Sequence, residues 1–312
     1  GYLMGGADII PGVSGGTMAL ILGVYERLVT AISRFDRKFI SLLGSGQWRL
    51  AAEHVDLRFL ASLAAGILCG VISLASLMHF LLEHHRSLTL AAFFGLIVGS
   101  SVLVARMIKP PTEQQRWYCI ILSALGAGIA WWIVSQQTVS GSDGVGYVFF
   151  CGAIAICAMI LPGISGAYIL LLLGKYSEIT GIIKQLPRLE VSLNEVWTLS
   201  VFALGCATGL LCFSKVLRWL LEHWHAATLS VLCGFMVGSL YRIWPFQTDT
   251  TPDVTELKHK IFEPYMPETL STHVVACAVI AFVAMVSVLA LNRVASALSA
   301  ADFTHAAGNT DV

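Results

Sequence analysis

Two short stretches rich in glycine and serine have the composition of anion-binding loops. The first elbow, residues 11–17, reads Pro-Gly-Val-Ser-Gly-Gly-Thr, and the second, residues 162–168, reads Pro-Gly-Ile-Ser-Gly-Ala-Tyr. Proline and glycine are the poorest helix formers, so each elbow interrupts the apolar segment around it and opens a new helix. The first amides of a helix lack internal partners and are a common site for phosphate. The sequence therefore predicts two anion-binding elbows.

The candidate phosphate-binding groups are backbone amides and hydroxyls of these elbows. They are Gly12, Ser14, Gly15, Gly16 and Thr17 in the first elbow, and Gly163, Ser165 and Gly166 in the second. Glycine lets a ligand approach the backbone closely, and the hydroxyls add donors. Neither elbow carries a formal positive charge, which suits a phosphate that must bind and then leave. The alternative is that the small residues only permit close helix packing.

Asp8 lies three residues before the first elbow, and its counterpart before the second elbow is Met159. An acidic residue inside a membrane is expected to be functional. Asp8 either carries a proton or holds Na⁺, which would couple transport to an ion gradient, or it caps the elbow by accepting hydrogen bonds from its amides. The sequence leaves both roles open.

The composition is that of a membrane protein that crosses the bilayer several times. Among the 312 residues, 56% are hydrophobic and only 12% are charged, and the mean hydropathy is +0.77. The formal net charge is zero and no basic tract occurs, so nucleic-acid binding is not expected. No metal site or cofactor is expected either. The eight cysteines form no CxxC pair, and the Glu83–His84 and Glu222–His223 pairs lack a third ligand at helical spacing.

Six stretches are long enough to span a bilayer, which takes about 20 apolar residues. They are 59–82, 88–108, 117–135, 197–221, 227–244 and 273–293. The two interrupted segments, 1–28 and 147–178, are predicted to be re-entrant hairpins, the first with helical arms 1–11 and 17–28. Tyr25 and Tyr176 lie at the hairpin exits and are typical of interfacial anchors. The basic segment 27–58 is expected to face the cytoplasm.

The chain is an internal duplication. "PGVSGGTMALILGVY" and "PGISGAYILLLLGKY" agree at eight of fifteen positions, and glycines at 66, 70, 95 and 99 recur at 205, 209, 234 and 238. The halves are 1–140 and 141–312, each with one hairpin and three crossings. Three is odd, so we expect an all-α protein made of two inverted repeats, the architecture of secondary transporters. The eight repeated glycines are interpreted as helix-packing positions.

The stretches "MGGADIIPGVSGGTMALILGVYE", "FFGLIVGS" and "PGISGAYILLLLGKY" resemble the bacterial polyprenyl-phosphate transporter family. The resemblance covers nearly the whole chain. It implies a multi-pass protein of the bacterial inner membrane that returns undecaprenyl phosphate, the lipid carrier of cell-wall synthesis, to the cytoplasmic leaflet. Similar proteins often have Ser–Phe where this chain has Ala167–Tyr168, which removes one hydroxyl and makes the phenol of Tyr168 a further candidate contact.

The function expected is therefore a lipid-phosphate carrier that works by alternating access, with proton or Na⁺ coupling left open. The alternative is an ion-coupled carrier of a small soluble anion that uses the same elbows. A membrane phosphatase would need a nucleophile with His and Arg or Lys partners inside the membrane. The histidines lie in loops away from the elbows, so no enzymatic activity is expected. The sequence does not indicate whether copies of the chain assemble into a homo-oligomer.

Overall fold

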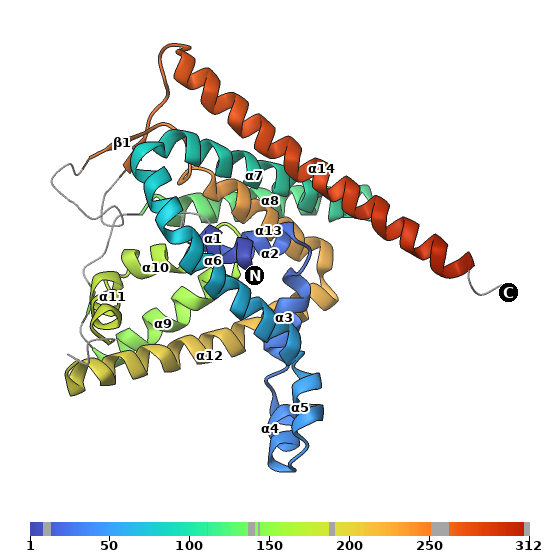
Figure 1. Ribbon diagram of the computed structural model, residues 1–312, viewed down its shortest axis with the longest axis vertical. Helices are drawn as coiled ribbons and strands as arrows, with labels where there is room; N and C mark the ends of the chain where they lie inside the picture. The colour runs from blue at the N-terminus through green and yellow to red at the C-terminus, as the bar shows by residue number, and fades with distance from the viewer. Residues whose placement is uncertain are drawn as a thin grey trace.

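The computed structural model describes residues 1–8, 14–110, 112–136, 141, 142, 144–186, 191–250 and 262–308, and these are mostly helical (Figure 1). Within them, five helices are long and apolar enough to cross a membrane. They are α6 (Leu57–His84), α7 (Arg86–Met107), α8 (Glu113–Val134), α12 (Leu193–His223) and α14 (Thr272–Gly308), whose apolar part is Thr272–Ala290. Five of the six predicted spans are thereby confirmed as helices of spanning length.

The predicted span 227–244 is shorter than expected. Helix α13 (His225–Ser239) has 15 residues and is therefore about 22 Å long, against a hydrocarbon core of about 30 Å. The chain then turns, with the Arg242 amide bonded to the Ser239 carbonyl. Pro245 follows, and a proline cannot continue the helical hydrogen-bond ladder.

The first interrupted segment consists of α1 (Tyr2–Asp8), α2 (Gly15–Ile21) and α3 (Tyr25–Ser33). Pro11 and Gly12 lie outside the described residues. The prediction of one helical arm over 17–28 is wrong, because α2 and α3 meet at 120°. Gly23 has φ +67°, a left-handed conformation that ends helices, and the Val24 amide bonds back to the Ala19 carbonyl at 2.9 Å.

The second interrupted segment repeats this construction. It consists of α9 (Val145–Ile160), α10 (Gly166–Leu172) and α11 (Tyr176–Gln185), with 119° between α10 and α11. Gly174 has φ +69°, and the Lys175 amide bonds to the Leu170 carbonyl at 3.1 Å. Each elbow is thus followed by a helix of seven residues and a second bend.

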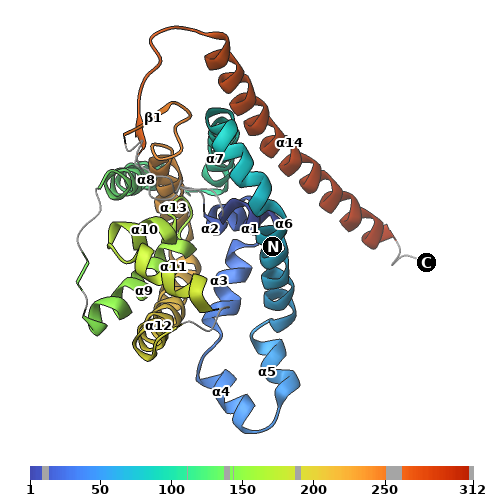
Figure 2. The ribbon, with the colours of Figure 1, turned by 60° about the vertical axis from the view of Figure 1, so that its left-hand side comes forward.

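The two ends of the molecule are different. Helices α4 (Arg37–Gly44) and α5 (Trp48–His54) form a small pair that projects from one end (Figures 1 and 2). At the opposite end, β1 (Gln247–Asp249) pairs antiparallel with β2 (Phe262–Pro264).

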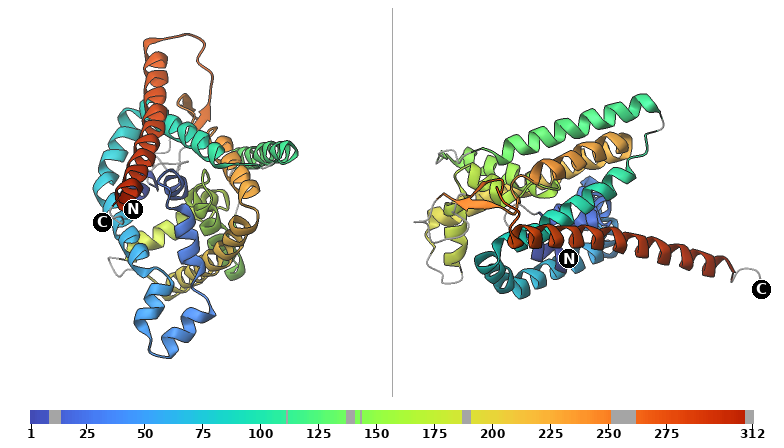
Figure 3. Two further views of the ribbon diagram at one scale, coloured as in Figure 1. Left: turned by 90° about the vertical axis from the view of Figure 1, so that its right-hand side faces the viewer. Right: turned by 90° about the horizontal axis from the view of Figure 1, so that it is seen from above.

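Helix packing repeats within the halves and between them. Helix α6 packs along α1 as α12 packs along α9, and α14 packs along α7 as α13 packs along α8 (Figure 3). Glycines line these contacts: Gly66 and Gly70 meet the backbone of α1, Gly205 and Gly209 that of α9, Gly95 and Gly99 that of α14, and Gly234 and Gly238 that of α8. A side chain there would collide with backbone atoms of the neighbouring helix. The packing interpretation of these eight glycines is confirmed.

Candidate functional site

The two elbows touch each other in the centre of the molecule. The Gly163 amide donates to the Thr17 hydroxyl at 2.8 Å, and the Ser14 hydroxyl donates to the Leu161 carbonyl at 3.3 Å. Gly16 lies against the end of α9, where a Cβ would come within 2.5 Å of the Ile160 carbonyl oxygen. Residues of the two halves that are far apart in sequence therefore meet at the elbows.

Ser14 and Thr17 organise the described part of the first elbow. Ser14 has an extended backbone and caps α2, because its hydroxyl accepts a hydrogen bond from the Thr17 amide at 3.3 Å. The two hydroxyls are also 3.3 Å apart, and Ser14 and Thr17 are only 1% and 0% exposed. Both hydroxyls are thus bonded inside the protein.

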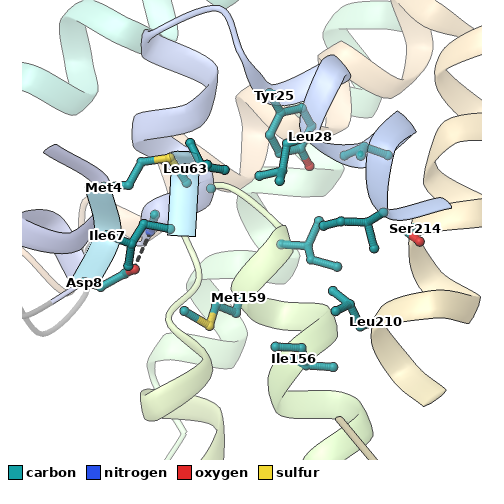
Figure 4. A pocket seen from close by; sticks show the side chains of 15 residues that line it. Met4, Asp8, Tyr25, Leu28, Leu63, Ile67, Ile156, Met159, Leu210 and Ser214 are labelled. Carbon is teal, nitrogen blue, oxygen red and sulfur yellow. Dashed lines mark hydrogen bonds between the residues drawn. The ribbon is translucent and has the colours of Figure 1, made fainter. Parts of the chain in front are cut away.

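Asp8 is hydrogen-bonded directly to the elbow that follows it. Its Oδ1 accepts a hydrogen bond from the Gly15 amide at 2.6 Å (Figure 4). This is the contact that the capping alternative predicts. A carboxylate placed against the first amide of α2 also matches the partial positive charge of a helix start.

The second elbow is held against α9 and α13. Gly163 has φ +91°, and a Cβ there would lie 2.7 Å from the Phe235 carbonyl oxygen. Gly166 packs against α9, where a Cβ would lie 2.5 Å from the Ala155 carbonyl oxygen. Ser165 begins α10 without a side-chain cap. Only glycine fits at position 163, because a side chain would collide with the Phe235 carbonyl and because the positive φ is unfavourable for other residues.

Tyr168 points away from the contact between the elbows. Its hydroxyl lies 3.0 Å from the Val134 carbonyl and 3.1 Å from the Gln136 carbonyl, both at the end of α8. The structure therefore brings Ser14, Gly16 and Thr17 together with the second elbow, whereas the phenol of Tyr168 is directed elsewhere.

Several of the predicted free amides have partners. The Gly15 amide is bonded to Asp8, the Thr17 amide to Ser14, and the Gly163 amide to Thr17. In the part of the chain that the structure describes, the amides of Gly16 and Gly166 have no acceptor. The expected set of unpaired donors is thus mostly satisfied within the protein in this structure.

A cavity of about 160 Å³ lies beside the first elbow, between α1, α3, α6, α9 and α12 (Figure 4). Its lining is apolar apart from Asp8, Ser214 and Tyr25. Tyr25 is 2% exposed, and its buried hydroxyl has no hydrogen-bond partner among the described residues. The interpretation of Tyr25 as an interfacial anchor is therefore wrong, because the bend at Gly23 turns α3 inward. Its position could not be deduced from sequence, since the bend decides it.

The Glu–His pairs at the helix ends form local contacts. Glu83 lies 3.4 Å from His79, and Glu222 lies 2.6 Å from Arg218, each one turn back on its own helix. Within the described residues, no group of three His, Cys, Asp or Glu side chains could hold a metal ion.

Comparison with known proteins gives a consistent picture. The model of a family described as undecaprenyl phosphate translocase-like matches residues 4–261. A protein of Vibrio cholerae serotype O1 named polyprenyl-phosphate transporter is 35% identical over 278 residues, which cover 87% of this chain and 86% of the relative. A protein of Staphylococcus aureus with the same name is 31% identical over 258 residues, which cover 78% and 84%. No solved structure matches significantly.

Proposed function

Since this chain belongs to the undecaprenyl phosphate translocase-like family, we propose that it carries undecaprenyl phosphate across the bacterial inner membrane. The direction proposed is return of the lipid carrier to the cytoplasmic leaflet for cell-wall synthesis. The observation that carries the proposal is the direct contact between the two elbows, through the hydrogen bond from Gly163 to Thr17. Irregular backbone at the centre of a membrane protein is tolerated where it is buried in protein or lines a polar cavity.

The headgroup site proposed is the pair of elbows. It comprises Gly12, Ser14, Gly15, Gly16 and Thr17 with Gly163, Ser165, Gly166 and Tyr168. In this structure, the amides of Gly15, Thr17 and Gly163 donate to a carboxylate and two hydroxyls of the protein itself. A bound phosphate replaces these internal acceptors with its own oxygens, which are stronger acceptors because they are charged.

Two inverted repeats, 1–140 and 141–312, are the architecture proposed. The matched pairings α1 with α6 and α9 with α12, and α7 with α14 and α8 with α13, support it. The first two pairings lie within one half each, and the last two join the halves in a matched way, which is what a duplicated fold with a pseudo-two-fold axis would produce.

Alternating access is supported by one asymmetry between the halves. Helix α3 packs against α12, with Arg218 of α12 donating to the Ser33 hydroxyl at 3.4 Å. The counterpart contact would join α11 to α6, and no comparable packing joins them among the described residues. The structure thus resembles one of two states, closed between α3 and α12. In the other state, we propose, that contact opens and α11 closes onto α6.

The apolar cavity beside the first elbow favours a lipid over a soluble anion. A small hydrated anion needs a polar route, whereas this cavity is lined by apolar groups except for Asp8, Tyr25 and Ser214. The runner-up function, a carrier of a small soluble anion, would use the same elbows but would move inorganic phosphate through the membrane.

The test is transport in proteoliposomes loaded with labelled undecaprenyl phosphate. Its distribution between leaflets is followed with a membrane-impermeant phosphatase, without a gradient and with a proton or Na⁺ gradient. We expect protein-dependent movement of the lipid phosphate and no uptake of radioactive inorganic phosphate. Lipid that stays in its leaflet under every gradient would refute the proposal, and uptake of inorganic phosphate alone would favour the runner-up.

A further inference from the structure

Arg242 lies beside the second elbow, and Gln247 links it to a second arginine, Arg86, from a distant part of the chain. Arg86 is the first residue of α7, and Arg242 lies in the turn after α13. Gln247 of β1 joins them, because its Oε1 accepts from Arg86 Nη2 at 3.1 Å and its Nε2 donates to the Arg242 carbonyl at 2.8 Å. The β1–β2 end of the molecule, where they lie, is opposite the α4–α5 end (Figure 2).

Both guanidinium groups lie over aromatic rings. Arg86 Cζ is 3.4 Å from the centre of the Phe262 ring, and Arg242 Cζ is 4.9 Å from the centre of the Tyr168 ring. An aromatic face attracts a guanidinium and fixes its plane while leaving the N–H groups at its edge free to donate. This arrangement holds two cations in place without neutralising them.

Neither arginine has an acidic partner among the described residues. Arg86 Nε and Nη1 are buried and have no hydrogen-bond acceptor in the part of the chain that the structure describes. Other arginines do pair with acids: Arg27 with Asp56, Arg49 with Glu53, Arg116 with Glu113 and Arg218 with Glu222. Asp249 attracts Arg86 electrostatically but forms no ion pair with it, and Arg86 and Arg242 repel each other. Half-buried like charges are costly when they have no counterion, as is the case here among the described residues, so an anion between them would relieve both.

We propose that Arg86 and Arg242 form a binding site for a phosphate monoester dianion. A dianion accepts hydrogen bonds from two guanidinium forks, and its charge matches the two cations, which form no ion pair with any described residue. The assignment of this dianion to a lipid headgroup rests on the proposed function, and free phosphate is the other source with the same chemistry. Because Tyr168 belongs to the second elbow, the arginine pair would receive the headgroup at this end before it reaches the contact between the elbows.

The test compares phosphate binding by the full chain and its arginine variants, purified in the same detergent. The variants are Arg86→Gln, Arg242→Gln, the two corresponding lysine variants and the double glutamine variant. The matched control is Arg116→Gln, which removes an exposed arginine that already has an acidic partner. The probes are radioactive inorganic phosphate and undecaprenyl phosphate, each titrated with and without excess sulfate, and the melting temperature is recorded with each probe.

We expect each glutamine variant to bind both probes about 10- to 100-fold more weakly, as loss of a charge-assisted hydrogen bond implies. The lysine variants should be intermediate, because lysine keeps the charge but not the fork. The double variant should be little weaker than the single ones, because both arginines hold one anion. The control should bind as the wild type does.

If Arg86→Gln and Arg242→Gln bind both probes with the affinity of the wild type, the inference is overturned. A lower melting temperature with the phosphate-dependent rise intact would also overturn it, since the arginines would then only support packing. If Arg86→Gln does not fold, the affinities of Arg86→Lys and Arg242→Gln for the two probes are compared with the wild type instead. Loss of lipid binding with retained phosphate binding supports a site for the lipid headgroup alone. A wild type that binds phosphate through the pair but leaves the lipid in its leaflet would refute the proposed function and not this site.

Discussion

Replacement of Thr17 by valine tests whether the contact between the elbows stabilises the protein. Valine has nearly the shape of threonine but no hydroxyl, so packing is kept while one acceptor is lost. The Gly163 amide, which donates to Thr17 at 2.8 Å, would be left without that partner in a site where Thr17 is fully buried. The 3.3 Å contact of the Ser14 hydroxyl would be lost as well.

The size of the effect follows from the burial of the orphaned group. A buried donor without an acceptor costs about 1–3 kcal/mol, whereas an exposed one costs little because water replaces the partner. With an unfolding entropy of about 2.1 cal/mol/K per residue, each kcal/mol corresponds to about 1.5 °C in Tm for a chain of 312 residues. We therefore expect Thr17→Val to lower Tm by about 1.5–5 °C. Thr17→Ser keeps the hydroxyl and should lose less.

The assay is thermal unfolding in one detergent, with Thr208→Val as the matched control. Thr208 is exposed on α12, and its hydroxyl bonds only to the Leu204 carbonyl of its own helix at 2.8 Å. This control should stay within about 0.5 kcal/mol of the wild type. Equal Tm values for Thr17→Val and Thr208→Val would refute the reasoning, as would a Thr17→Ser variant no more stable than Thr17→Val.

Three further predictions concern the elbows and the α4–α5 end. Gly166→Leu should abolish lipid transport in proteoliposomes although the protein inserts, because a Cβ at this position lies 2.5 Å from a backbone oxygen. The control is Gly128→Leu, which should transport normally because no atom lies within 4 Å of a Cβ there. Asp8→Asn should keep the wild-type Tm, because the asparagine side chain retains an oxygen that can accept the hydrogen bond of the cap. Asp8→Ala should lower the free energy of unfolding by about 1 kcal/mol. If the gradient dependence of transport instead vanishes in Asp8→Asn, Asp8 serves ion coupling. The hydrogen bond from the Phe39 amide, with a smaller contribution from His54, lowers the pKa of Asp36 below its ordinary value of 3.8. The stabilisation of α4 by the Asp36 carboxylate is therefore complete above pH 3.8, and it is lost as the pH falls through the lower pKa of the folded state. Hydrogen exchange of α4 and α5 should therefore accelerate in Asp36→Ala at pH 7 and less in Asp36→Asn, and equal exchange in both variants and the wild type would contradict this role.

Much of the backbone plan could be predicted because it depends on local properties. An apolar stretch of spanning length forms a spanning helix, and five of six such stretches do so. Pro162 and Gly163 interrupt their segment wherever it lies, since proline removes a donor and glycine favours the left-handed conformation observed here. The second bends at Gly23 and Gly174 have the same local cause. A single glycine within an apolar stretch is not enough, however, to predict a break in the helix.

Two matching interruptions of the apolar segments, and glycines at the helix contacts, follow from local residue order. The groups that satisfy the elbows follow from the three-dimensional packing, because the partners Thr17 and Gly163 are 146 residues apart. The same packing buries Tyr25, and through it Gln247 links Arg86 to Arg242, neither of which forms an ion pair with a described residue. Helix breaks depend on neighbours along the chain, whereas hydrogen-bond partners and uncompensated charges depend on neighbours in space.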